Sequence, residues 1–156
     1  MLEVKKISYD RKKGIVKVIY DELDGESDTK EVTFTAYDRP LESFVNALDA
    51  LAQDVLTICQ LPDEYGSTLQ VRSVSLSRTD GILGAVITSL KELGTSYAPL
   101  VLNTPHLPYT PYSDGDDNAP VLPAGCKSRI ENLIFETEKY INGDRSEKQE
   151  KLKLVG

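Results

Sequence analysis

The choice of catalytic side chains in this sequence is narrow, because it contains one histidine, His106, and two cysteines, Cys59 and Cys126. A Cys–His pair could assemble in the fold, since catalytic partners need not be neighbours in sequence. Both cysteines lie in apolar patterns typical of helices, however, whereas a reactive thiolate needs an accessible, electropositive site. Two cysteines and one histidine are also too few for a structural zinc site without carboxylates or a second chain.

Catalytic and cofactor-binding motifs are also missing from the sequence. It has no nucleophile elbow, phosphate-binding loop, dinucleotide fingerprint or zinc-protease helix motif. We therefore predict a protein that is not an enzyme, that carries no cofactor and whose two cysteines are reduced and structural.

The most unusual segment is NTPHLPYTPYSDGDDN, residues 103–118. Its prolines stiffen the chain, which lowers the entropic cost of ordering a binding surface. Tyr109 and Tyr112 could stack on a nucleobase or anchor a partner protein. The alternative is that both tyrosines only pin a long loop to the sheet. We expect this segment to be the functional surface, with its candidate residues being His106, Tyr109, Tyr112, Asp116 and Asp117.

The acidic part of this segment partly matches a calcium-binding loop. Asp114, Asp116 and Asn118 would fill the first three ligand positions. The pattern then fails, because Ala119 stands where the glycine belongs and Gly125 where the bidentate glutamate belongs. A solvated acidic loop tip is therefore favoured, with weak calcium or magnesium binding as the alternative.

Charge narrows the class of partner. The chain has 156 residues and a net charge of -7, from 18 basic and 25 acidic side chains. Such a protein repels duplex DNA unless its charges are segregated. Only residues 1–20 carry a local excess of positive charge, six basic against two acidic side chains. The basic residues of this stretch are Lys5, Lys6, Arg11, Lys12, Lys13 and Lys17.

Two binding hypotheses follow from these cations, although a solvated hairpin is the simpler explanation of the charge run. The basic hairpin, with Tyr9 or Tyr20 for stacking, could bind single-stranded nucleic acid. Arg72 and Arg78, together with the histidine of the proline-rich segment, could contact the phosphates of a nucleotide-type ligand.

Hydropathy patterns predict the elements that must position these groups. Residues 2–9, 15–20 and 30–37 have the composition of three strands of an antiparallel meander. Apolar residues at spacings of three and four predict one amphipathic helix over 40–59, beginning at Pro40 and ended by Pro62. An acidic turn at 21–28 and the acidic outer side of this helix are further surfaces for a partner.

The second half of the chain contains more strands and one more helix. A strand over 67–78 slips in phase near Arg72 and Ser73, which predicts a bulge or a bend. Asp80-Gly81 predicts a hairpin, so residues 82–93 are assigned to a strand although a helix also fits their period. The remaining elements are a short strand at 98–103, an irregular loop at 104–122 with five prolines if extended by one residue, and a helix from about 126 to 141.

The order of elements predicts an α+β fold: one antiparallel sheet of about five to six strands, two helices packed on it and a long proline-rich loop. Residues 1–143 would form a single domain, and residues 144–156 a charged, disordered tail. No apolar run is long enough for a membrane span, and the first residues have no apolar signal core, so we expect a cytoplasmic protein.

Two segments also carry a resemblance. QLPDEY at 60–65 and APLVLNTPHLP at 98–108, within a layout that spans residues 1 to about 143, resemble a group of small uncharacterised proteins encoded by bacteriophages and prophages. The resemblance implies an accessory protein that acts in a bacterial cytoplasm, and it assigns no catalytic residue.

Three functions are therefore considered. The first is a non-enzymatic phage-type accessory protein that binds a host or phage protein. The second is a protein that binds or sequesters a small nucleotide-type ligand. The third is single-stranded nucleic-acid binding through the basic N-terminal hairpin, against which the net charge argues. The oligomeric state is left open.

Overall fold

The structure, a computed structural model, describes residues 2–23 and 28–145 of the chain. Residues 24–27 of the predicted acidic turn and 146–156 of the predicted tail lie outside the described residues. The elements in chain order are β1 (Leu2–Asp10), β2 (Ile15–Leu23), β3 (Thr29–Ala36), α1 (Glu42–Asp49), α2 (Ala52–Cys59), the 3-10 helix η1 (Asp63–Thr68), β4 (Leu69–Thr79), β5 (Ile82–Lys91), β6 (Leu100–Asn103), β7 (Leu107–Pro108) and α3 (Cys126–Ile141).

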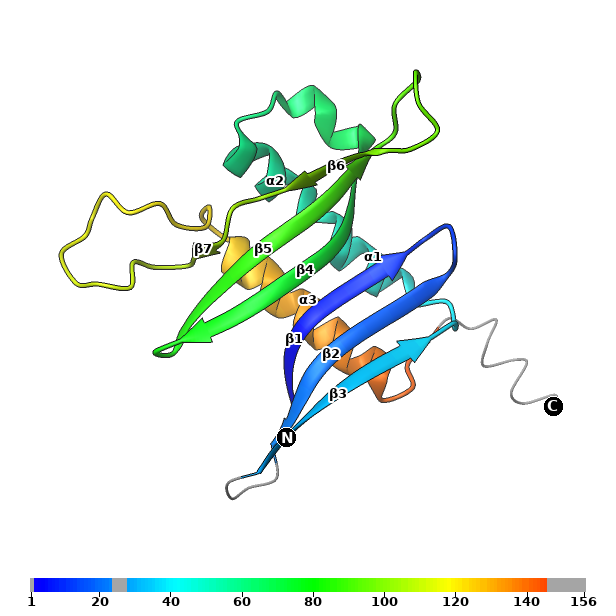
Figure 1. The fold of residues 1–156 in the computed structure, drawn as a ribbon, viewed down its shortest axis with the longest axis horizontal. Coiled ribbons are helices and arrows are strands. Elements are labelled where there is room, and N and C mark those ends of the chain that lie inside the picture. The colour runs from blue at the N-terminus through cyan, green and yellow to red at the C-terminus, as the bar shows by residue number, and fades with distance from the viewer. Residues whose placement is uncertain (1, 24–27, 146–156) are drawn as a thin grey trace.

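All strands join one antiparallel sheet in the order β3-β2-β1-β4-β5-β6, with β7 paired to β5 beyond the end of β6 (Figure 1). The sheet consists of two meanders, β1–β3 and β4–β6. Their junction is short: β1 and β4 share only the pairs Lys6–Ser75, Ile7–Val74 and Ser8–Ser73. The predicted α+β fold with one antiparallel sheet is confirmed.

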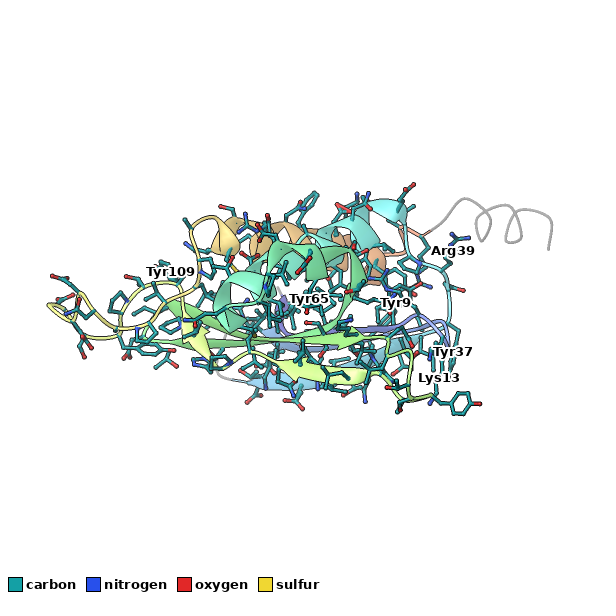
Figure 2. The ribbon with its side chains drawn as sticks, turned by 90° about the horizontal axis from the view of Figure 1, so that it is seen from above. Tyr9, Lys13, Tyr37, Arg39, Tyr65 and Tyr109 are labelled. Carbon is teal, nitrogen blue, oxygen red and sulfur yellow. The ribbon has the colours of Figure 1, made fainter. Side chains whose placement is uncertain are left out.

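The helices α1, α2 and α3 cover one face of the sheet, and Figure 2 shows this layer on one side of the strands. Period-two alternation supplies the core from this side, because alternate residues of each strand point toward the helices. The largest fully buried side chains are Tyr140, Phe44, Ile7, Leu48, Leu51, Ile87, Ile130, Leu133, Val4, Val16, Val18 and Val55. We call the opposite face, which no described helix covers, the open face.

The single helix predicted over 40–59 is divided into α1 and α2 at Ala50 and Leu51. At the break the amide of Leu51 donates to the carbonyl of Leu48, three residues back, at 3.2 Å. The next helical turn begins at Leu51, whose carbonyl accepts hydrogen bonds from the amides of Asp54 and Val55. Leu48 and Leu51 are both fully buried, so the core contacts continue through the break. α1 then packs on α3, whereas α2 lies against β4 and β5. The prediction of one continuous helix is wrong at this point.

A buried ion pair joins α2 to α3. The carboxylate of Asp54 is 1% exposed and is bound by Arg129, with Nε to Oδ2 at 2.8 Å and Nη2 to Oδ1 at 2.5 Å. The Arg129 side chain is 27% exposed, and its Nη2 also donates to the carbonyl of Ala124 at 3.2 Å. This bidentate contact neutralises the Asp54 carboxylate, which would otherwise be a buried charge without a partner beneath the helices.

Three local predictions are confirmed in β4 and β5. The register of β4 against β5 shifts between Val71 and Ser73, which is the predicted bulge. Asp80 and Gly81 have φ of 52° and 78°, as a two-residue hairpin turn of this hand requires. Residues 82–91 form a strand, not the rival helix.

Between β7 and α3 the chain has no described helix or strand.

The first two residues of the predicted tail, 144 and 145, lie within the described residues. Arg145 forms an ion pair with Asp38, and its guanidinium lies 4.6 Å from the ring centroid of Tyr140. None of the described helices is long and apolar enough to cross a membrane.

Candidate binding site on the open face

The open face contains a shallow depression of about 400 Å³ that crosses β2, β1, β4, β5 and β6. It is lined by Lys6, Ser8, Lys17, Ile19, Arg72, Ser73, Thr88, Leu90 and Val101. Three of these side chains are cationic and three carry hydroxyls, and none is acidic. We call this feature the basic depression.

Strand register explains why these residues meet. Lys6 pairs with Ile19 and Ser8 with Lys17 across β1 and β2, so the two lysines are diagonal neighbours on the same face. Across the junction, Ser8 pairs with Ser73. The basic depression therefore lies over the point where the two meanders join.

Three lysines of the N-terminal hairpin differ in their ion pairing. Lys5 Nζ lies 2.7 Å from a carboxylate oxygen of Glu31 and 3.7 Å from one of Asp21. The hydrogen bond to Glu31 is the largest cause of the raised pKa of Lys5, which keeps this ammonium charged. Lys6 and Lys17 make no ion pair with any described residue, and both are exposed. These two ammonium groups are therefore available to an external anion.

Arg72 is already held in place at the rim of the depression. Its Nη2 lies 3.2 Å from Oδ2 of Asp10. Asp10 also accepts hydrogen bonds from the amides of Lys12 and Lys13, each at 3.1 Å. The Lys13 amide, and after it the charge of Arg72, lower the pKa of Asp10. Arg72 is thus fixed in position but partly neutralised.

His106 lies on the same face, farther along β4 and β5. Its Nε2 is 2.7 Å from Oγ of Ser77, and its ring stacks on Tyr112 with centroids 6.5 Å apart and planes 5° apart. The ring sits above Gly84, where a Cβ would come within 2.5 Å of Nε2. Ser77 on β4 and Gly84 on β5 are paired across the two strands. The loop residue His106 therefore packs over both, because Ser77 provides the hydrogen bond and Gly84 leaves space for the ring. Sequence reasoning missed Ser77, which no motif marks.

A serine that is hydrogen-bonded to a histidine also has the geometry of a nucleophile and its general base. Hydrolases add a third group that orients the other ring nitrogen, and donors for the oxyanion. Within the described residues, no hydrogen bond to Nδ1 of His106 is found. Tyr112 stacks on the imidazole. The arrangement matches a clamp that holds the loop on the sheet.

The two candidate tyrosines of the loop have different environments. Tyr109 packs against the core, its amide donates to the carbonyl of Leu83 at 2.9 Å, and Lys127 Nζ lies 4.3 Å from its ring centroid. It therefore has the contacts of a residue that pins the loop next to α3, at the end of the molecule opposite Lys13 (Figure 2). Tyr112 is 46% exposed and presents part of its ring to solvent.

Arg78 does not join Arg72. Its Nη1 donates to the carbonyl of Val4 at 2.8 Å and lies 3.4 Å from Oε1 of Glu3. It lines a different hollow, which includes Phe135 of α3. The bulge in β4 explains the separation, because it changes the phase of the strand between the two arginines.

The tyrosines considered for stacking in the basic hairpin also lie on the helix side. Tyr20 is 9% exposed, and Tyr9 makes an edge-to-face contact with Phe44 at 6.2 Å between centroids. Neither ring can serve a ligand on the open face.

The loop tip and the cysteines complete the predicted candidates. Asp114, Asp116, Asp117 and Asn118 are exposed. No group of three or more His, Cys, Asp or Glu side chains in residues 2–23 and 28–145 is placed to hold a metal ion. Cys126 is fully buried, and burial, followed by nearby Asp54, raises its pKa to about 12. Cys59 is half-buried, and burial raises its pKa as well.

Comparisons with protein-family models, curated proteins and solved structures found no match. Any proposal for the function of this chain must therefore rest on the chemistry of the surface itself.

Proposed function

We propose that this chain is a non-enzymatic binding protein that takes up a phosphate-bearing ligand in the basic depression. The observation that carries the proposal is the pair Lys6 and Lys17, two exposed ammonium groups without an ion-pair partner in the described residues. They lie as diagonal neighbours in a protein whose net charge is -7. A bound anion would relieve their mutual repulsion.

The other lining groups suit the same class of ligand. Hydroxyls of Ser8, Ser73 and Thr88 can donate to phosphate oxygens, and Arg72 offers a planar fork of donors. Ile19 and Leu90 supply apolar contacts for a sugar or base. A volume of about 400 Å³ lies within the range of small-molecule sites.

Calorimetric titration with pyrophosphate and with ATP tests the proposal. The variants Lys6→Gln and Lys17→Gln should each weaken binding several-fold, because each removes a charge-assisted contact. Lys5→Gln is the matched control, since Lys5 adjoins Lys6 but is paired with Glu31. Equal affinities in all three variants, or no binding by the unmodified protein, would contradict the proposal.

A second function, the phage-type accessory protein that binds a protein partner, is supported by the edge strand β6. Leu100 and Val101 are 43% and 52% exposed there, and β6 ends the strand order of the described sheet. Such an edge can accept a strand from another protein. A photo-crosslinking residue at Leu100 should then yield one discrete product in bacterial cells, whereas the same residue at Thr35 of β3 should not. Equal crosslinking from both positions would count against β6.

A further inference from the structure

The basic depression and the exposed ring of Tyr112 belong to one continuous side of the molecule. Ser73, at the depression, and Ser77, which bonds His106, are four residues apart on β4. A strand rises about 3.3 Å per residue, so the two places are about 13 Å apart. This distance suits a short run of linked nucleotides.

The His106–Tyr112 stack has the properties of a base-stacking platform. His106 is positioned by Ser77 and by the absence of a side chain at Gly84, so the ring beneath Tyr112 is set before any ligand arrives. Tyr112 itself remains 46% exposed. Preset aromatic rings bind bases of any sequence at low entropic cost.

Cationic side chains continue beyond the depression, away from Tyr112. A second hollow of about 180 Å³ shares Arg72 and Leu90 with the basic depression and adds Lys12 and Lys13 from the β1–β2 turn. Lys12 is paired with Glu92 at 3.6 Å, so it contributes less than its charge suggests. Asp10 and Glu92 also line this hollow, and among the described residues Lys13 is its one cation without an ion pair, so Lys13 is the further contact that it offers to a linear polyanion.

We propose that the phosphate-bearing ligand is a single-stranded nucleic acid. Its backbone lies over Lys6, Lys17 and Arg72, and one base stacks on Tyr112. The inference deepens the proposed function and depends on it. It differs from the hairpin hypothesis drawn from sequence, because Tyr9 and Tyr20 take no part.

The acidic loop tip limits the strand at the Tyr112 end. Asp114, Asp116 and Asp117 follow Tyr112 closely in sequence and are exposed. They repel phosphates, so the bound segment stops near the aromatic stack and covers only a few nucleotides. Neutralising this tip with the double substitution Asp116→Asn and Asp117→Asn should therefore raise the affinity.

Fluorescence anisotropy with labelled oligothymidylates of two, four, six and eight nucleotides tests the inference. Affinity should rise with length and then level off once the strand reaches both the cations and Tyr112. Three phosphate contacts predict a slope of about -2 in log K against log salt concentration. Lys6→Gln should reduce that slope by about 0.7, and Lys5→Gln should leave it unchanged.

Tyr112 provides the readout that separates a strand from a single nucleotide. Tyr112→Ala should weaken the six-nucleotide ligand about tenfold, the usual effect of losing one stacked base. Its effect on pyrophosphate binding should be negligible, and Tyr112→Trp should restore the affinity for the oligonucleotide. Thermal melting of each variant checks that the fold is retained.

The outcomes distinguish the two proposals. If pyrophosphate or ATP binds but longer oligonucleotides bind no more tightly and Tyr112→Ala has no effect, the inference fails while the proposed function stands. If none of these ligands binds, both fail. Equally tight binding of a poly-aspartate peptide, or tighter binding of a duplex, would also overturn the assignment to single strands.

Discussion

Removing the positive charge of Arg129 is expected to destabilise the fold strongly. Arg129→Met keeps most of the aliphatic stem but leaves the Asp54 carboxylate without its partner. Because that carboxylate is 1% exposed, it cannot recover hydration unless α2 and α3 separate. Breaking a buried pair from one side costs about 3–5 kcal/mol, so we expect a loss in the free energy of unfolding of that size.

The two sides of this pair should respond unequally. Asp54→Asn leaves Arg129 behind, but its side chain is 27% exposed and can reach water. We therefore expect a smaller loss of about 1–2 kcal/mol. The double variant Asp54→Leu with Arg129→Met replaces both charges by apolar groups and should be more stable than Arg129→Met alone. Lys5→Met, which breaks a surface pair with Glu31, is the control and should cost much less than Arg129→Met.

Urea unfolding followed by circular dichroism at neutral pH measures these differences. The comparison requires equal m-values, since a changed slope would indicate a different unfolded or native state. The reasoning would be refuted if Arg129→Met lost no more stability than the Lys5→Met control. It would be refuted equally if Asp54→Asn lost as much as Arg129→Met, because the predicted asymmetry comes from the difference in exposure.

Three further predictions concern single positions. Gly84→Ala should lower stability by about 1–3 kcal/mol by displacing the imidazole above it, whereas Gly94→Ala, where a Cβ meets nothing within 4 Å, should have little effect in the same unfolding assay. In native protein at pH 8, a disulfide-exchange reagent should titrate Cys59 quickly and Cys126 only on unfolding, since the pKa of Cys126 is raised to about 12; two fast thiols would contradict this. Gln60→Gly should raise the melting temperature, because the C-cap of α2 has a φ of 57°, where a side chain costs about 1 kcal/mol; a lower value would refute this.

The strands could be predicted because local signals agree with the sheet. The run IVKVIY is β-branched and aromatic, and Asp80-Gly81 demands a tight reversal, which decided between strand and helix for residues 82–93. The break between α1 and α2 has no such signal. The residues at the break, Ala50 and Leu51, are not helix breakers such as proline or glycine, and the apolar spacing runs through the break. The break depends on how the two halves pack, which one-dimensional periodicity does not contain.

The candidate site also has features that the sequence predicts and features that only the folded structure shows. Composition placed the cations in the first twenty residues, but only the folded structure shows that Lys6 and Lys17 have no ion-pair partner among the described residues while Lys5 has two. Likewise, the loop could be identified from its prolines and aromatic residues. Which tyrosine packs and which stays exposed depends on β7 and α3, and nothing local distinguishes Tyr109 from Tyr112.

The short junction between β1 and β4 has a consequence for how binding and local opening are linked. Only three residue pairs join the meanders in the strand ladder there, beside the side-chain contacts of Arg72 and Arg78 with β1, and Lys6, Ser8 and Ser73 of those pairs also line the basic depression. Partial opening of the junction would separate the two walls of the site. A ligand that touches both walls binds only the closed form, so occupancy must protect the junction amides from hydrogen exchange in proportion to ligand concentration. Hydrogen exchange at these few amides therefore reports both how often the two meanders separate and whether the ligand is bound.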